Sequence, residues 1–172
     1  MSSPNTPDAP DLTPGPLDVP VPVRWTDLDA YGHVNNAAMV RLLEEARVDQ
    51  PRAPLGIHPL GAPQPPAALP VSGAGADLST VIASQRIEYA RPLGHRRDGV
   101  VVRLWLSRIG GASLSVDYLV LTRDDPEGAA PYARARTVVV LIDAETEAPV
   151  RLEQGTRTAL EAFRGEPLRF RD

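Results

Sequence analysis

The order of the sequence patterns predicts an α+β fold in which one antiparallel sheet packs against one amphipathic helix. The helical pattern comes first, with apolar residues at i, i+3, i+4 and i+7: Met39, Leu42, Leu43 and Ala46. Strand-like runs with alternating apolar positions follow it, and a Gly110–Gly111 pair between two of them signals a hairpin. Because a single helix must bury its apolar face, we expect one curved sheet to wrap it.

The N-terminal region predicts a tail and a first strand. Residues 1–20 are rich in proline and poor in apolar side chains, so we expect a disordered tail, followed by one domain over residues 21–172. Val21, Val23 and Trp25 alternate with polar residues and proline, which predicts the first strand.

The middle of the chain predicts the helix, a long loop and the remaining strands. Asn35 or Asn36 can cap the start of the helix, and Pro51 ends it. Residues 51–75 exceed the usual length of a connection, so this loop is either flexible or a functional lid. The expected strands cover residues 81–90, 99–108, 112–122 and 132–142, and residues 152–163 read as a short terminal helix.

Length and charge indicate a single domain without a nucleic-acid surface. A chain of 172 residues is long enough for one core and too short for two comfortable ones. The net charge is −4 and no basic run stands out, which argues against nucleic-acid binding. The chain shows neither a run of apolar residues that could span a bilayer nor a secretory signal pattern, so we expect a cytoplasmic protein without a membrane partner.

The residue types that are absent exclude several kinds of chemistry. With no cysteine, the chain has no disulfide, thiolate metal site or cysteine nucleophile. All 18 basic residues are arginine, which excludes lysine chemistry. His33, His58 and His95 share no metal-ligand spacing, and the G-x-S-x-G and phosphate-loop patterns are missing. We therefore expect neither a metal nor a bound cofactor.

Polar groups concentrate between the first strand and the helix. Two acids, Asp27 and Asp29, lie in this turn, ahead of Gly32 and His33. A helix N-terminus presents unpaired backbone N–H groups and a partial positive charge, which suit a carbonyl oxygen that becomes anionic. A carboxylate beside such an end could attack a carbonyl or activate water.

The stretch W-T-D-L-D-A-Y-G-H-V-N-N, followed by a helix ending L-L-E-E-A-R, resembles the opening of the 4-hydroxybenzoyl-CoA thioesterase-like hotdog proteins. Within that group it is most similar to the short bacterial acyl-CoA thioesterases. The rest of the chain agrees only in the order of its elements. The resemblance implies a hotdog fold, with an antiparallel sheet wrapped around one long central helix. It also implies a homodimer or homotetramer with the active site at the subunit interface.

The resemblance assigns roles to residues of the turn. Asp29 aligns with the catalytic acid of the family, as nucleophile toward the thioester carbonyl or as general base toward water. The backbone N–H of Asn36 would donate to the thioester oxygen, and Asn35 serves as a cap. His33 could orient the carboxylate or the substrate, or be satisfied by backbone alone. Gly32 permits a backbone conformation that a side chain would forbid, whereas Asp27 is expected to hold the turn.

Coenzyme A would need cations for its phosphates and a path for pantetheine. The arginine candidates are Arg86, Arg91, Arg96, Arg97 and Arg108, because guanidinium suits phosphate. For any single one of them a solvated surface charge is the more ordinary role, and the adjacent Arg96 and Arg97, beside His95, are the most suggestive pair. The turn with Gly111 and Ser113 resembles the place where related proteins approach the pantetheine arm with backbone.

These observations lead to the hypothesis of an acyl-CoA thioesterase, which converts acyl-CoA and water to a carboxylic acid and CoA. Two alternatives stay open: a thioesterase acting on acyl-carrier protein, and a non-catalytic acyl-CoA-binding hotdog domain.

Overall fold

The computed structural model describes residues 15–48, 78–125 and 127–171. Its elements, in chain order, are β1 (Leu17–Val21), the short 3-10 helix η1 (Trp25–Asp27), α1 (Asn36–Val48), β2 (Leu78–Tyr89), β3 (Val100–Ile109), β4 (Ser113–Leu121), β5 (Ala133–Asp143) and α2 (Gln154–Glu161). The 51–75 loop and the first 14 residues of the expected tail lie outside the described residues.

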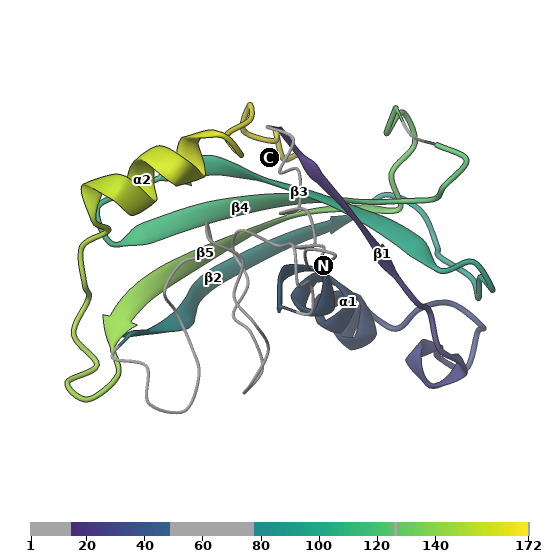
Figure 1. Cartoon of the computed structure of the whole chain (residues 1–172). Helices are drawn as coiled ribbons and strands as arrows, with labels where there is room; N and C mark the ends of the chain where they lie inside the picture. Colours follow the sequence, from purple (N-terminus) through teal and green to yellow (C-terminus); the bar gives the residue numbers. More distant parts are fainter. Residues whose placement is uncertain (1–14, 49–77, 126, 172) are drawn as a thin grey trace, which may run out of the picture.

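The strands form one antiparallel sheet in the order β1-β3-β4-β5-β2. The sheet arches over α1, which lies on its inner side (Figure 1). The chain turns tightly between β3 and β4, where Gly110 N donates to Ser113 O at 2.7 Å. The predicted α+β class, the antiparallel sheet and the Gly110–Gly111 hairpin are confirmed.

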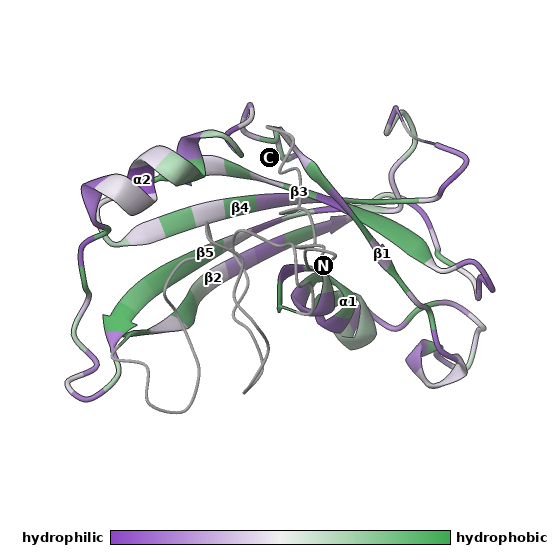
Figure 2. Cartoon of the chain, viewed as in Figure 1, coloured by the Kyte–Doolittle hydropathy of each residue, from purple (hydrophilic) through white to green (hydrophobic). Residues whose placement is uncertain are grey.

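The inner face of the sheet carries the core. Alternate residues of the three central strands are at most 4% exposed, and the strands are banded by hydropathy accordingly (Figure 2): Val100, Val102, Leu104, Leu106, Leu114, Val116, Tyr118, Val120, Ala133, Ala135, Thr137, Val139 and Leu141. Burying one Val or Leu side chain contributes about 1.5 to 3 kcal/mol. This repeated contribution is what holds the helix and the sheet together.

The apolar face of α1 packs as predicted, but the helix is not long. Met39, Leu42, Leu43 and Ala46 are at most 2% exposed, and α1 packs mainly against β1 and β3. It has 13 residues, a length of roughly 20 Å. The prediction of one long central helix is therefore not confirmed, and its expected end at residue 50 lies outside the described residues. No helix in the described ranges has the length and apolar character needed to cross a membrane.

The first strand lies earlier in the chain than predicted. β1 ends at Val21, which pairs with Val100, and the chain has left the sheet when η1 begins at Trp25. Both the predicted and the observed strand place valines on one face, so alternation alone could not decide between them. Gly99 lies against the end of β1, where the chain leaves the sheet. Its φ is +69°, and a Cβ there would collide with Val21 O.

The C-terminal segment continues from α2 across the outer side of the sheet. Phe163 O accepts the N–H of Leu106 at 2.9 Å, and Gly165 N donates back to Leu106 O at 2.9 Å. Trp105 then donates its indole N–H to Glu166 O at 2.9 Å. The segment is thereby fixed to β3 before it reaches β4.

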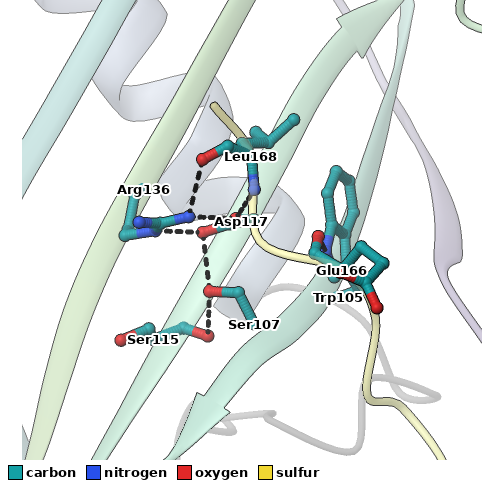
Figure 3. A network of polar contacts seen from close by, with 7 residues as sticks. All are labelled: Trp105, Ser107, Ser115, Asp117, Arg136, Glu166 and Leu168. Atoms are coloured by element: carbon teal, nitrogen blue, oxygen red, sulfur yellow. Dashed lines mark hydrogen bonds and ion pairs between the residues drawn. The ribbon is translucent and has the colours of Figure 1, made fainter. Parts of the chain in front are cut away.

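Asp117 anchors this segment to the sheet (Figure 3). Its carboxylate is fully buried and accepts from the guanidinium of Arg136 at 2.6 and 2.7 Å. The same carboxylate accepts the Ser107 hydroxyl at 2.9 Å and the backbone N–H of Leu168 at 2.7 Å. The hydrogen bond from Asp117 raises the pKa of Arg136. Both oxygens of a buried carboxylate are thus satisfied, which offsets the cost of removing the charge from water.

We expect Asp117→Asn to lower the free energy of unfolding by about 3 kcal/mol, because it breaks a buried pair and leaves polar partners unsatisfied. The measurement is the urea midpoint of unfolding, followed by circular dichroism. Asp18→Asn is the matched control, since Asp18 pairs bidentately with Arg103 while 47% of its own side chain is exposed. A surface pair of that kind contributes about 1 kcal/mol or less. Equal shifts for the two variants would contradict the role assigned to burial.

Candidate functional site

A buried aspartate shapes the turn that leads into α1. The carboxylate of Asp27 is fully buried and accepts the backbone N–H of Arg24 at 2.7 Å. The backbone oxygen of Asp27 accepts the N–H of Asn35 at 2.8 Å. One residue therefore holds both ends of the turn, which agrees with the structural role expected for it.

Asp29 lies in the same turn and uses one carboxylate oxygen to hold it. Its Oδ1 accepts the backbone N–H groups of Tyr31 at 2.9 Å and His33 at 3.1 Å. Its Oδ2 makes no hydrogen bond within the described part of the chain. Gly32, with φ +77°, closes the turn by donating its N–H to Asp29 O at 3.1 Å. A side chain is strained at that φ, so glycine lets the backbone fold around the carboxylate.

The first turn of α1 presents an unused donor beside this carboxylate. Asn35 caps the helix, with its Oδ1 accepting the N–H of Ala37 at 2.8 Å, and its backbone oxygen accepts the N–H of Met39 at 2.9 Å. The backbone N–H of Asn36 donates to no group among the described residues. The helix start thus offers an N–H and a partial positive charge.

A second segment, which follows β2, closes the site. Val34 N donates to Leu93 O at 2.7 Å, and His33 pairs with Gly94 in an isolated bridge. From the end of β2, the Tyr89 hydroxyl donates to Asn36 O at 3.4 Å. Burial raises the pKa of Tyr89, so this phenol stays a neutral donor near pH 7.

Together these segments enclose a pocket of about 350 Å³, lined by Asp29, His33, Val34, Asn36, Met39, Tyr89, Ala90, Arg91, Pro92 and Leu93. The pocket brings together four of the predicted site residues, namely Asp29, His33, Asn36 and Arg91, while Gly32 and Asn35 belong to its adjoining turn. The imidazole of His33 makes no hydrogen bond within the described ranges. Sequence reasoning missed Tyr89 and Leu93, since only the placement of β2 beside α1 shows that they face the site.

Three of the five arginine candidates for phosphate binding, Arg91, Arg96 and Arg97, differ in their surroundings. Arg91 stacks its guanidinium 3.8 Å from the centroid of the Tyr132 ring. Arg96 makes two hydrogen bonds to Asp98, at 3.2 and 3.1 Å, and a third to Asp124 at 3.4 Å. The bond from Arg96 holds the pKa of Asp98 below its ordinary value. Arg97 is exposed and makes no side-chain contact of this kind to any described residue.

Gly111 and Ser113 lie at the other end of the sheet from the pocket. Ser113 pairs with Val140, whereas Tyr89 of the pocket pairs with Ala133. Because Ala133 and Val140 are separated by seven positions of β5, the two ends are roughly 23 Å apart. Within one protomer, Gly111 and Ser113 do not reach the pocket.

A second pocket, of about 340 Å³, contains none of the predicted site residues. Asp18 and Arg103, which pair with each other, contribute to its lining, so their charges are already matched. Within the described ranges, no group of three or more His, Asp or Glu side chains gathers in a metal-binding arrangement. The pocket with Asp29 is therefore the candidate active site.

Several solved structures resemble this chain over most of its length. A putative acyl-CoA thioesterase from Xanthomonas campestris is 31% identical, with 74% of this chain and 93% of that chain covered and a TM-score of 0.54. A thioesterase from Thermus thermophilus, complexed with coenzyme A and Zn, is 28% identical over 88% and 96%, with a TM-score of 0.60. A probable thioesterase from Escherichia coli is 26% identical over 86% and 97%, also with a TM-score of 0.60.

No curated protein matches the sequence. The family model of the thioesterase-like superfamily matches residues 23–160, which include β2 to β5, α1 and the whole turn that carries Asp29. The chain therefore belongs to the thioesterase-like superfamily and is a thioester hydrolase with the hotdog fold.

Proposed function

We propose that this protein is an acyl-CoA thioesterase and that Asp29 performs its chemistry. The observation that carries the proposal is the placement, in a single pocket, of a carboxylate oxygen and a helix N–H that bond to no described residue. The names of the Xanthomonas and Thermus relatives, one an acyl-CoA thioesterase and the other a complex with coenzyme A, support the substrate class.

In the proposed reaction, the thioester oxygen accepts the N–H of Asn36 as negative charge develops on it. Such a donor typically stabilises the transition state by about 3 kcal/mol. Asp29 Oδ2 either attacks the carbonyl carbon or removes a proton from an attacking water. In both cases a C–O bond forms, the C–S bond breaks, and the CoA sulfur leaves and takes up a proton. In the first case, water then hydrolyses the anhydride and frees Asp29.

The neighbouring side chains fit supporting roles. The Tyr89 hydroxyl contacts the carbonyl of Asn36, so it fixes the first turn of α1 against β2. His33 lines the same pocket as Asp29, and we assign its imidazole the role of orienting substrate. Arg91 is held against Tyr132 in the pocket wall and supplies a fixed positive charge.

We also propose that two chains associate through β2. This strand is an edge of the described sheet, and its Val81 and Ile82 are 42% and 43% exposed. An exposed apolar edge strand tends to pair with another strand. A second copy would cover this edge and extend the site from outside, which is also the route by which a partner's Gly111 and Ser113 could approach a pocket.

We expect Asp29→Asn to fold normally and to lower kcat on acyl-CoA by roughly 100-fold or more, because the amide is neither a nucleophile nor a base. CoA release from a panel of acyl-CoAs, detected with a thiol-reactive dye, measures this effect. The chain contains no cysteine and so adds no background signal. Asp18→Asn, at the second pocket, serves as the control and should keep the full rate.

Unchanged kcat/KM in Asp29→Asn would rule out the assigned role. Acyl-CoA that binds to the wild type without turnover would favour a non-catalytic binding domain. Turnover restricted to acyl-carrier protein would favour the other alternative.

For the association, we expect sedimentation velocity to show a dimer or a tetramer, and Val81→Arg to shift the population toward monomer. The added guanidinium would have to leave water when the apolar edges pair, which opposes association. Ala159→Arg, on the exposed surface of α2, adds the same charge elsewhere and should leave the association unchanged. A wild-type monomer at micromolar concentration would contradict the proposed interface.

A further inference from the structure

An exposed aromatic pair lies next to the candidate active site. The rings of Trp25 and His95 are stacked, with centroids 4.1 Å apart and an interplanar angle of 10°. Trp25 is nevertheless 74% exposed, whereas Trp105 is only 7% exposed and has its N–H satisfied by Glu166 O. Since His95 covers one face of the Trp25 indole, the exposure of the indole leaves the other face open.

Both rings are attached to the walls of the candidate pocket. Trp25 begins η1, which ends at the buried Asp27 and continues into the turn with Asp29. His95 follows Gly94, which pairs with His33 of the same turn. The two chain segments that line the pocket therefore continue outward to this stack. Their mutual hydrogen bonding holds the rings in a fixed relation to the reacting groups.

We propose that the Trp25–His95 stack is the platform on which the adenine ring of CoA binds, and that Arg97 binds a phosphate of the same nucleotide. This inference rests on the proposed function and adds a subsite to it. A base stacks on an aromatic face without needing a hydrogen-bond code. An indole whose second face is open, close to a thioester site, has the shape and chemistry for that ligand.

Arg97 is an exposed cation close to the stack in the sequence. It lies two positions after His95, is exposed, and makes no ion pair with any described residue. By contrast, Arg96 is neutralised by Asp98 and Asp124. A guanidinium binds phosphate oxygens in a bidentate manner, so an arginine of this kind beside an adenine platform completes a nucleotide site.

This subsite distinguishes CoA from a carrier protein. Both substrates present the acyl group on a long pantetheine arm, but only CoA ends in an adenine nucleotide. The effect of the stack is thus confined to substrates that carry the nucleotide, while Asp29 acts on every thioester.

The test compares acyl-CoA with the corresponding acyl-pantetheine. We expect Trp25→Ala to raise KM for acyl-CoA on the order of tenfold, the usual contribution of one stacked base, with kcat nearly unchanged. KM for acyl-pantetheine should not rise, and Trp25→Phe should retain most of the affinity for acyl-CoA.

Arg97→Gln should raise KM for acyl-CoA only, whereas Arg151→Gln, at another exposed arginine without an ion pair to a described residue, should have no effect.

The platform is refuted if Trp25→Ala changes KM for neither substrate or for both equally, or if it changes the oligomeric state instead. A wild type that hydrolyses neither substrate would refute the proposed function, and the platform is then tested by binding alone. Saturable quenching of tryptophan fluorescence by CoA, absent with pantetheine and lost in Trp25→Ala, would support it. No quenching by CoA would overturn it.

Discussion

The packing of α1 against β1 and β3 is the interaction on which the site depends. Because the buried face of the helix fixes its axis relative to the sheet, the position of its first N–H groups is fixed too. The bond between Asp27 O and Asn35 N ties the turn that carries Asp29 to that helix start, and the bond between Val34 N and Leu93 O ties the second wall of the pocket to the turn. The carboxylate of Asp29 lies in a loop, and these bonds fix that loop relative to the packed helix and sheet.

Three aspartates have the same side chain but different surroundings. Asp117 is buried and fully hydrogen-bonded, with an arginine as its counter-ion. Asp27 is equally buried and its Oδ2 holds the shape of the turn. Of the three, Asp29 is the one that is partly exposed, and its Oδ2 makes no hydrogen bond within the described part of the chain. Oδ1 of Asp27 accepts no hydrogen bond either, but it is buried and lies 3.8 Å from an Arg41 guanidinium nitrogen. A carboxylate buried in the fold is closed to a substrate, whereas Asp29 lines the candidate pocket while its Oδ1 holds the turn.

Local patterns were sufficient to predict most of the fold, and the resemblance of one short stretch singled out residues that lie together in the candidate pocket. The helix face, the later strands and the hairpin depend on neighbours in sequence, and Asp29, His33 and Asn36 lie within eight positions of one another. Features that depend on distant partners could not be predicted. The alternation through Trp25 predicted a strand because nothing local reveals that η1 turns its indole to solvent. Arg96 looked available because one of its partners, Asp124, lies 28 positions away.

The C-terminal segment meets the sheet largely through its own backbone. Phe163 O, Gly165 N, Glu166 O and Leu168 N supply these contacts, so a side chain here is free to differ between related proteins unless it makes a contact of its own. Phe163 is buried in the core, and the ring of Phe170 lies under the guanidinium groups of Arg86 and Arg136. Gly165 is constrained as well, since any Cβ there would press against the ring of Trp105. The number of residues in the segment, in contrast, is fixed. One inserted or deleted residue would move every later backbone group away from its partner on the sheet. Evolution in this segment should therefore proceed by substitution, with its length held constant.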